Sequence, residues 1–312
     1  DFLEAVGRVL RRIEGAYALG MLCADCPDRI IAARKDAPLL LGYGKGCNFL
    51  ASDVTAIIKH TRDVAYMEDG EVAVLTCDGI EVYDALEQKV EKKHFTIDWE
   101  VSAAEKGGYQ HFMLKEIMEQ PEALRRAISP RVKEGKVVFD DLKLPVEKMR
   151  EFTRIFIVAC GSSYHVGMLG KYTLEHLLRR NVEVVLASEF RYCDPIVDDK
   201  SLVIVISQSG ETLDTMAALR EAKKRGGYIL SIVNVVGSSI ARESDDVLYT
   251  WAGPEIAVAT TKAYSTQLAV LDMIGLAFGS ALGTVKKEEY EEAVAELQKL
   301  PGKMEQFLAS DS

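Results

Sequence analysis

The segment Ser207-Gln208-Ser209-Gly210-Glu211-Thr212 has the residue types and spacing of a phosphate-binding loop. It follows the apolar run 202–206 and precedes a stretch with helical periodicity, so Thr212 is the expected N-cap of a helix. The first N–H groups of a helix have no partner within it, and the helix dipole is positive at that end. Gly210 permits close backbone approach, and three hydroxyls can donate to phosphate oxygens. We therefore expect this loop to bind the phosphate of a small ligand such as a sugar; the alternative is an ordinary Ser/Thr-rich helix cap.

A second loop, Cys160-Gly161-Ser162-Ser163, follows the apolar run 154–159 and is also rich in Gly and Ser. In a doubly wound sheet these two strands can be neighbours, so the hydroxyls of Ser162 and Ser163 could converge on the same ligand. A simple turn is the alternative.

A third loop, 253–262, precedes another helix and supplies hydroxyl and backbone groups suited to a sugar. Thr260 could, however, be only the N-cap of the following helix. Lys262 is expected to be a surface residue of the first helical turn and not a Schiff-base lysine. The loop 234–239 is expected to pack beside the site without contacting the ligand.

The elements that must position these loops alternate between strand and helix after Arg150. Strands that are apolar throughout and are separated by helices indicate a parallel sheet covered on both faces, and ligands of such α/β sheets bind beyond the carboxyl ends of the strands. The predicted strands are 154–159, 182–187, 202–207, 228–233 and 247–251, and the predicted helices are 164–179, 212–224 and 264–281.

The N-terminal part reads as a helix, 2–13, followed by short strand-like runs bounded by Gly, Asp or Pro. This pattern predicts stacked antiparallel sheets in an α+β domain. Asp69-Gly70 and Asp78-Gly79 lie between apolar runs and predict hairpins. Residues 86–98 are charged and aperiodic, and the amphipathic helix predicted over 109–128 is interrupted at Gln120-Pro121.

Composition narrows the function classes. The net charge of −10, without a basic stripe on any predicted helix, argues against nucleic-acid binding. The longest apolar stretch, 268–282, contains Asp272 and is shorter than a membrane span, so it predicts a buried helix and no membrane association. The start of the chain has no secretory signal pattern, so we expect a cytoplasmic protein. Cys23-Ala24-Asp25-Cys26 predicts a turn with free thiols, and no second cysteine pair completes a metal site.

The chain resembles the glutamine:fructose-6-phosphate amidotransferases (isomerising), also called glucosamine-6-phosphate synthases. The segments that carry the resemblance are 159–164, 187–192, 207–212 and 258–263, together with 108–117, 119–121, 14–17 and 51–53. It covers essentially the whole chain. Thr260 stands where many relatives have serine, so a hydroxyl is retained.

The resemblance implies a partial glutaminase domain of Ntn-hydrolase type over 1–90, a linker with a helix over 91–140, and a first sugar isomerase (SIS) domain over 141–283. Residues 284–312 would begin the connection to a second SIS domain. The family's cysteine nucleophile and glutamine-binding residues have no counterpart here, and the Schiff-base lysine and isomerase base belong to that second domain. The resemblance therefore implies no catalytic residue in this chain.

What the resemblance does carry over is a sugar-phosphate site. Ser207, Gln208, Ser209 and Thr212 would surround the phosphate, and Ser162, Ser163, Val258 and Thr260 would line the sugar. The ligand would be fructose 6-phosphate or glucosamine or glucose 6-phosphate; glutamine would bind only to the full-length parent, a homodimer, and no cofactor or metal is implied.

Two other functions stay open on the sequence alone. A non-catalytic SIS sensor of sugar phosphates would be expected to carry a helical DNA-binding domain in place of the β-rich N-terminal part. A phosphosugar isomerase without amide transfer would not require the linker at 109–121, which resembles that of the amidotransferases.

Overall fold

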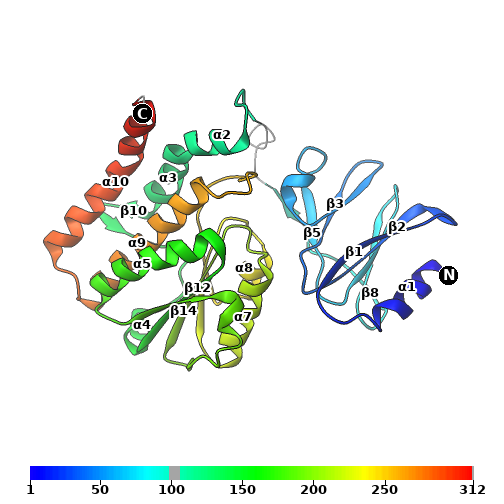
Figure 1. The fold of residues 1–312 in the computed structure, drawn as a ribbon, viewed down its shortest axis with the longest axis horizontal. Coiled ribbons are helices and arrows are strands. Elements are labelled where there is room, and N and C mark those ends of the chain that lie inside the picture. The colour runs from blue at the N-terminus through cyan, green and yellow to red at the C-terminus, as the bar shows by residue number, and fades with distance from the viewer. Residues whose placement is uncertain (98–105, 311–312) are drawn as a thin grey trace. The chain divides into compact units, whose positions relative to one another are not determined.

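The computed structural model describes residues 1–97 and 106–310, and its contacts divide the chain into two compact units, Asp1–Glu105 and Lys106–Ser312 (Figure 1). The boundary falls inside the segment 91–140 that the sequence assigns to a linker. The finer sequence-based divisions at residues 90, 140 and 283 stay predictions.

The first unit begins with helix α1 (Phe2–Leu10), which is followed by two antiparallel sheets. One has the strand order β1-β2-β6-β7-β8 and the other β4-β3-β5-β9. The strands are β1 (Tyr17–Cys23), β2 (Cys26–Lys35), β3 (Leu40–Tyr43), β4 (Asn48–Ala51), β5 (Asp63–Tyr66), β6 (Val72–Leu75), β7 (Ile80–Tyr83), β8 (Lys89–Val90) and β9 (Phe95–Thr96). The sequence pattern did not predict β8 and β9, which lie in the charged segment 86–98.

The two sheets share one core. Ala32 and Ala73 from the first sheet and Leu41 from the second belong to a single cluster of buried side chains. Hydrophobic residues that alternate along each strand bury one face of each sheet against the other. This packing confirms the prediction of antiparallel sheets in the N-terminal part.

One of the two predicted hairpins is confirmed and the other is wrong. Asp78-Gly79 joins the paired strands β6 and β7. Asp69-Gly70, in contrast, joins β5 to β6, which lie in different sheets. The Asp69 carboxylate accepts hydrogen bonds from the Arg34 guanidinium at 2.7 Å and from the Asp36 N–H at 2.8 Å, so it ties the sheet-to-sheet crossing to β2.

The Cys23–Cys26 segment is the turn between β1 and β2, and both cysteines are free thiols. The prediction of a plain turn is therefore confirmed.

The second unit contains a five-stranded parallel sheet with the order β13-β12-β14-β15-β16. Its strands are β12 (Arg154–Ala159), β13 (Val182–Leu186), β14 (Ser201–Ser207), β15 (Tyr228–Val233) and β16 (Asp246–Tyr249). The helices are α2 (Phe112–Met118), α3 (Gln120–Ile128), α4 (Val146–Glu151), α5 (Gly161–Leu178), α6 (Ala187–Phe190), α7 (Leu213–Lys224), α8 (Ser239–Glu243), α9 (Lys262–Leu282) and α10 (Lys287–Ala309), and β10 (Val132–Lys133) pairs with β11 (Lys136–Val137).

Helices cover both faces of this sheet, as the uniformly apolar strands predict (Figure 1). Ile155 and Ile157 of β12 face the side on which α5, α9 and α10 pack. Phe156 and Val158 face the opposite side, on which α6, α7 and α8 pack. The strand side chains alternate between the faces, so each face needs its own apolar cover.

The expected break at Gln120-Pro121 separates α2 from α3, with Pro121 in the first turn of α3. Proline is tolerated there because its missing N–H would have no helical partner. Both helices pack within the second unit: Leu124 and Ile128 of α3 belong to the core that also contains α9.

Helix α9 is the one helix among residues 1–97 and 106–310 that is long and apolar enough to cross a membrane. It is the expected buried helix, since 61% of its most apolar window lies inside the protein. It carries one carboxylate, Asp272, whose Oδ1 atom is buried with no hydrogen-bond partner among the described residues. Burial raises the pKa of Asp272 to about 6, against the lowering effect of a hydrogen bond from Thr173.

Asp272→Asn is expected to stabilise the chain at pH 8 but not at pH 4. The pKa of Asp272 is higher in the folded than in the unfolded state, so ionisation removes stability as the pH rises from about 4 to about 6. Replacing the carboxyl group with an amide should raise the free energy of unfolding at pH 8 by about 2 to 3 kcal/mol. Urea unfolding at both pH values measures this, with Asp199→Asn at an exposed position as the control. An equal gain at the two pH values would contradict the assignment.

Candidate functional site

The Ser207–Thr212 loop and the Cys160–Ser163 segment lie side by side at the carboxyl edge of the parallel sheet. The second segment was predicted to be a loop, but in the structure Cys160 is the N-cap of α5 and 161–163 belong to its first turn. The two segments follow β14 and β12, which are hydrogen-bonded neighbours with Ala159 paired to Ile206. From β12 the chain passes to β13 on one side, whereas from β14 it passes to β15 on the other. The strand order therefore reverses between β12 and β14, and this switch point is where α/β sheets bind ligands.

The Ser207–Thr212 loop is shaped by its own hydroxyl groups. Ser207 is buried, and its Oγ accepts the N–H of Gly210 at 3.0 Å and lies 3.0 Å from Thr212 Oγ1. Ser209 Oγ accepts the N–H of Glu211 at 3.2 Å. Thr212 is the N-cap of α7, as predicted, but its side chain does not cap the helix. The loop thus places half-buried Gln208, Ser209 and Thr212 at the positive end of α7.

Neither of these two loops contains a lysine or an arginine. An anion held there would be bound by N–H groups and hydroxyls alone. Helix N-termini bind phosphate in this way, but the Coulombic attraction is weaker than that of an arginine side chain in contact with the phosphate.

Gly210 occupies a position that only glycine fits. Its φ angle is +68°, and a Cβ added to it would lie 2.0 Å from Ser238 Oγ and 2.5 Å from Ser238 Cβ. The 234–239 loop packs directly against the phosphate loop, since Ile240 donates its N–H to Gly210 O and Asn234 donates its N–H to Gln208 O. The expected supporting role of this loop is consistent with these contacts.

The two serines at the start of α5 have different surroundings. Ser162 is exposed. Ser163 is buried and donates its hydroxyl proton to Gln267 Oε1 of α9 at 3.0 Å. Of the two, Ser162 is the more accessible to a ligand, while Ser163 connects the first turn of α5 to α9.

The third loop follows β16 and leads into α9, at the same edge of the sheet. Its tip presents Val258, which is fully exposed, and Thr260, which is half-buried. Thr261, not Thr260, is the N-cap of α9, and its side chain makes no capping hydrogen bond. Instead, Glu255 Oε1 accepts the N–H groups of Thr261 at 2.9 Å and Ala263 at 3.2 Å. Burial raises the pKa of Glu255 above its ordinary value, against the lowering effect of these hydrogen bonds.

The prediction that Lys262 is a surface residue is wrong. Its side chain is only 2% exposed, and its Nζ donates to Glu119 Oε2 at 2.6 Å. Glu119 lies between α2 and α3, so a residue 143 positions earlier in the chain satisfies the charge of this buried lysine. A buried ammonium group without such a partner would be strongly destabilising.

Sequence reasoning missed three residues that organise the site: Glu116, Glu119 and Gln267. Glu116 Oε1 accepts the N–H groups of Ile256 at 2.6 Å and Ala257 at 3.1 Å. A signal was available for the two acids, because side chains three apart lie on one helix face. Gln267 directly precedes the apolar run 268–271, and a polar residue at the edge of a buried stretch indicates a hydrogen-bond partner.

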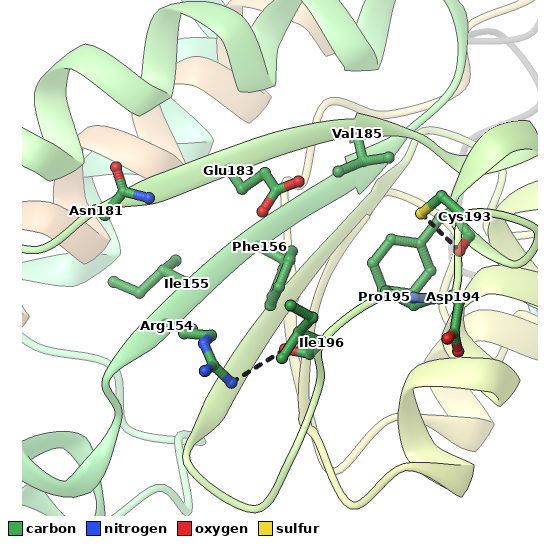
Figure 2. Close-up of a pocket in the computed structure, with 11 residues that line it drawn as sticks. Arg154, Ile155, Phe156, Asn181, Glu183, Val185, Cys193, Asp194, Pro195 and Ile196 are labelled. Atoms are coloured by element: carbon green, nitrogen blue, oxygen red, sulfur yellow. Dashed lines mark hydrogen bonds between the residues drawn. The ribbon is translucent and has the colours of Figure 1, made fainter.

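Other cavities lie elsewhere in the second unit. One of about 440 Å³ runs along β12 and β13 (Figure 2). Figure 2 shows Glu183 and Val185 of β13 beside Phe156 of β12, with Arg154 at the amino end of β12 bonded to the backbone oxygen of Ile196. A larger cavity of about 630 Å³ lies between α5, α9 and α10. Neither of these two cavities is lined by a residue of the three candidate segments 160–163, 207–212 and 253–262.

Comparison with known proteins gives one domain family and many relatives. Residues 148–277 match the SIS domain family. The chain is 52% identical over 99% of its length to "Glutamine--fructose-6-phosphate aminotransferase [isomerizing]" of Caldanaerobacter subterraneus and 49% identical over its whole length to the protein of the same name in Clostridium tetani. It spans about half the length of each of these relatives, 51% in both cases.

A solved structure agrees with these matches. The C-terminal domain of glucosamine-fructose-6-phosphate aminotransferase from Francisella tularensis is 41% identical, with a TM-score of 0.61. The similarity covers 64% of this chain and 56% of that one. The match confirms the α/β fold of the second unit.

Proposed function

The chain belongs to the family of glutamine–fructose-6-phosphate aminotransferases, and we propose that it carries the sugar-phosphate site of such an enzyme. The parent protein would form glucosamine 6-phosphate from fructose 6-phosphate and glutamine. The observation that carries the proposal is the pairing of β12 with β14, which brings two Ser-rich loops together at the switch point of the sheet.

The phosphate would bind at the start of α7. Ser209 and Thr212 would donate their hydroxyl protons to it, the Gln208 amide would contribute a further donor, and Ser207 would hold the loop in place through Gly210. When Ser207 donates the proton of its hydrogen bond with Thr212 Oγ1, the hydroxyl proton of Thr212 stays available to the phosphate.

The sugar would extend from the phosphate toward the neighbouring loops. Ser162 and Ser163 follow β12, the strand next to β14, and would meet the sugar hydroxyls on that side. Val258 and Thr260 would contact the sugar from the loop before α9. An exposed valine at a loop tip offers an apolar surface for the carbon face of a sugar ring, and the threonine hydroxyl can donate or accept a hydrogen bond.

This chain would bind substrate without completing the reaction. We assign no catalytic residue to it, since the nucleophile that releases ammonia and the base and lysine of the isomerase step would come from other parts of the parent. The parent would use no metal or redox cofactor, act as a homodimer in the cytoplasm and bind glutamine in addition to the sugar phosphate. The near-complete match to aminotransferases favours this function over a sugar-phosphate sensor or an isomerase.

The 312-residue chain is expected to bind fructose 6-phosphate with a dissociation constant on the order of 1 mM and to form no glucosamine 6-phosphate. The affinity is modest because only N–H and hydroxyl groups face the phosphate. Titration calorimetry with fructose 6-phosphate measures binding, and unphosphorylated fructose is the control that should not bind. Product formation is assayed with both glutamine and ammonia. Equal affinity for fructose 6-phosphate and fructose would contradict the phosphate site. Formation of glucosamine 6-phosphate would contradict the proposal that this chain binds the substrate without completing the reaction.

A further inference from the structure

The segment 252–265, which comprises the loop before α9 and the first turn of α9, is hydrogen-bonded to α2, α3 and the residue between them on both sides of its tip. Before the tip, the Arg126 guanidinium donates to Ala252 O at 3.3 Å, and Glu116 accepts the N–H groups of Ile256 and Ala257. After the tip, Lys262 pairs with Glu119. Ser265 also donates its hydroxyl proton to Gln120 Oε1 at 2.6 Å.

Two of these groups, Glu116 and Lys262, are buried charged side chains, which distinguishes their contacts from ordinary surface contacts. Glu116 and Lys262 are each 2% exposed, and Lys115, 3.5 Å from Glu119, is 7% exposed. Glu116 Oε2 is buried without a hydrogen-bond partner among the described residues. A buried carboxylate that accepts two N–H groups with one oxygen holds those groups firmly, because losing them would leave its charge uncompensated.

The contacts leave the tip free. Residues 258 and 259 are exposed, and Val258 is fully so, although the backbone on each side of them is tied to α2, α3 or Glu255. An exposed tip on an anchored base presents its side chains in one geometry without filling the space in front of them. This is the arrangement that a preorganised ligand contact requires.

We propose that Glu116 is a positioning residue for the sugar: it holds the 253–261 loop so that the site is formed before the ligand arrives. This inference rests on the proposed function, because it concerns the same site. Its consequence is selective. A free phosphate contacts only the Ser207–Thr212 loop, so its affinity should not depend on Glu116, whereas the affinity of a sugar phosphate should.

The size of the effect follows from the fraction of molecules in which the loop is in place. Apparent affinity falls in proportion to the population that can bind. If losing Glu116 reduces the positioned population to about one tenth, fructose 6-phosphate binds about tenfold more weakly.

The experiment compares Glu116→Ala with wild type in the full chain, using fructose 6-phosphate and inorganic phosphate as probes. Calorimetry should show at least about tenfold weaker binding of the sugar phosphate and less than about twofold change for inorganic phosphate. Hydrogen exchange should become faster at residues 256 and 257. Glu122→Ala, an exposed acid on α3 that pairs with Arg125, is the matched control and should change neither affinity.

Glu116→Asp is the second variant, in case the alanine variant does not fold. It keeps the charge and shortens the side chain by one methylene, so it should still accelerate exchange at residues 256 and 257 and weaken sugar-phosphate binding. Unchanged exchange, or equal losses for both probes, would overturn the inference. A wild-type chain that fails to bind fructose 6-phosphate would overturn the proposed function, while the exchange rates would still show whether Glu116 holds the loop.

Discussion

Ser209→Ala combined with Thr212→Ala is expected to raise the dissociation constant for fructose 6-phosphate at least about 100-fold. Each substitution removes one hydroxyl that, in the proposed site, would donate to a dianionic phosphate. A hydrogen bond to a charged group contributes about 1.5 to 3 kcal/mol, so losing both removes most of the roughly 4 kcal/mol of binding free energy that a dissociation constant on the order of 1 mM represents, and binding should no longer be measurable. Titration calorimetry on the wild-type and double-variant chains measures the loss.

The same double variant should remain folded. Within the protein, Ser209 Oγ accepts only a 3.2 Å hydrogen bond from Glu211, and Thr212 Oγ1 contacts Ser207 in a half-buried position. Their loss should lower the free energy of unfolding by less than about 2 kcal/mol. Ser280→Ala, on an exposed position near the end of α9, is the control for removal of a serine hydroxyl. Unchanged affinity in a folded double variant would show that the phosphate binds elsewhere.

The parallel sheet was predictable from local sequence, because strands that are buried on both faces are apolar at every position. The carboxyl edge of such a sheet then follows from the direction of the strands. The Ser207–Thr212 loop could be placed at a helix start because it stands between such an apolar strand and a stretch with helical periodicity. The adjacency of β12 and β14 could be anticipated as one possibility of a doubly wound sheet, but only the pairing of Ala159 with Ile206 establishes it.

The errors concern partners that are distant in sequence. Lys262 looks like a solvated first-turn lysine until Glu119, 143 residues earlier, is placed beside it. Ser163, whose contact with a ligand stays a prediction, also has a partner that the sequence did not suggest, because Gln267, 104 residues later, accepts its hydroxyl proton. Asp69-Gly70 has the local pattern of a hairpin turn, yet its strands pack in different sheets. Local sequence propensity predicts a turn, but it does not predict which strands pair in the folded chain.

The 234–239 loop shows that a contact between distant residues can also constrain a segment whose local structure was predicted correctly. Its sequence shows no more than a supporting segment, but its Ser238 side chain sets the space that is available to Gly210. The Ser207–Thr212 loop can therefore keep its shape only while the side chains at positions 210 and 238 stay small.

Gly210→Ala is expected to be the most destabilising single change at the site. The left-handed φ of +68° costs a residue with a Cβ about 1 to 2 kcal/mol. Overlap of that Cβ with Ser238, at 2.0 Å from Oγ, adds about 1 to 3 kcal/mol through forced displacement of the two loops. The free energy of unfolding should fall by about 2 to 5 kcal/mol, and binding of fructose 6-phosphate should be lost with the loop geometry. Urea denaturation and calorimetry measure the two effects.

Two further variants separate strain from overlap. Gly135→Ala has a similar φ of +71° but no atom within 4 Å of the added Cβ, so it should show only the backbone cost of about 1 to 2 kcal/mol. Adding Ser238→Gly to Gly210→Ala removes both clashing atoms and leaves Val233 Cγ1, at 3.6 Å, as the nearest remaining neighbour. This double variant should recover the overlap part of the loss, as a coupling energy in a double-mutant cycle. Equal losses for Gly210→Ala and Gly135→Ala, with no recovery in the double variant, would mean that Ser238 does not constrain the phosphate loop.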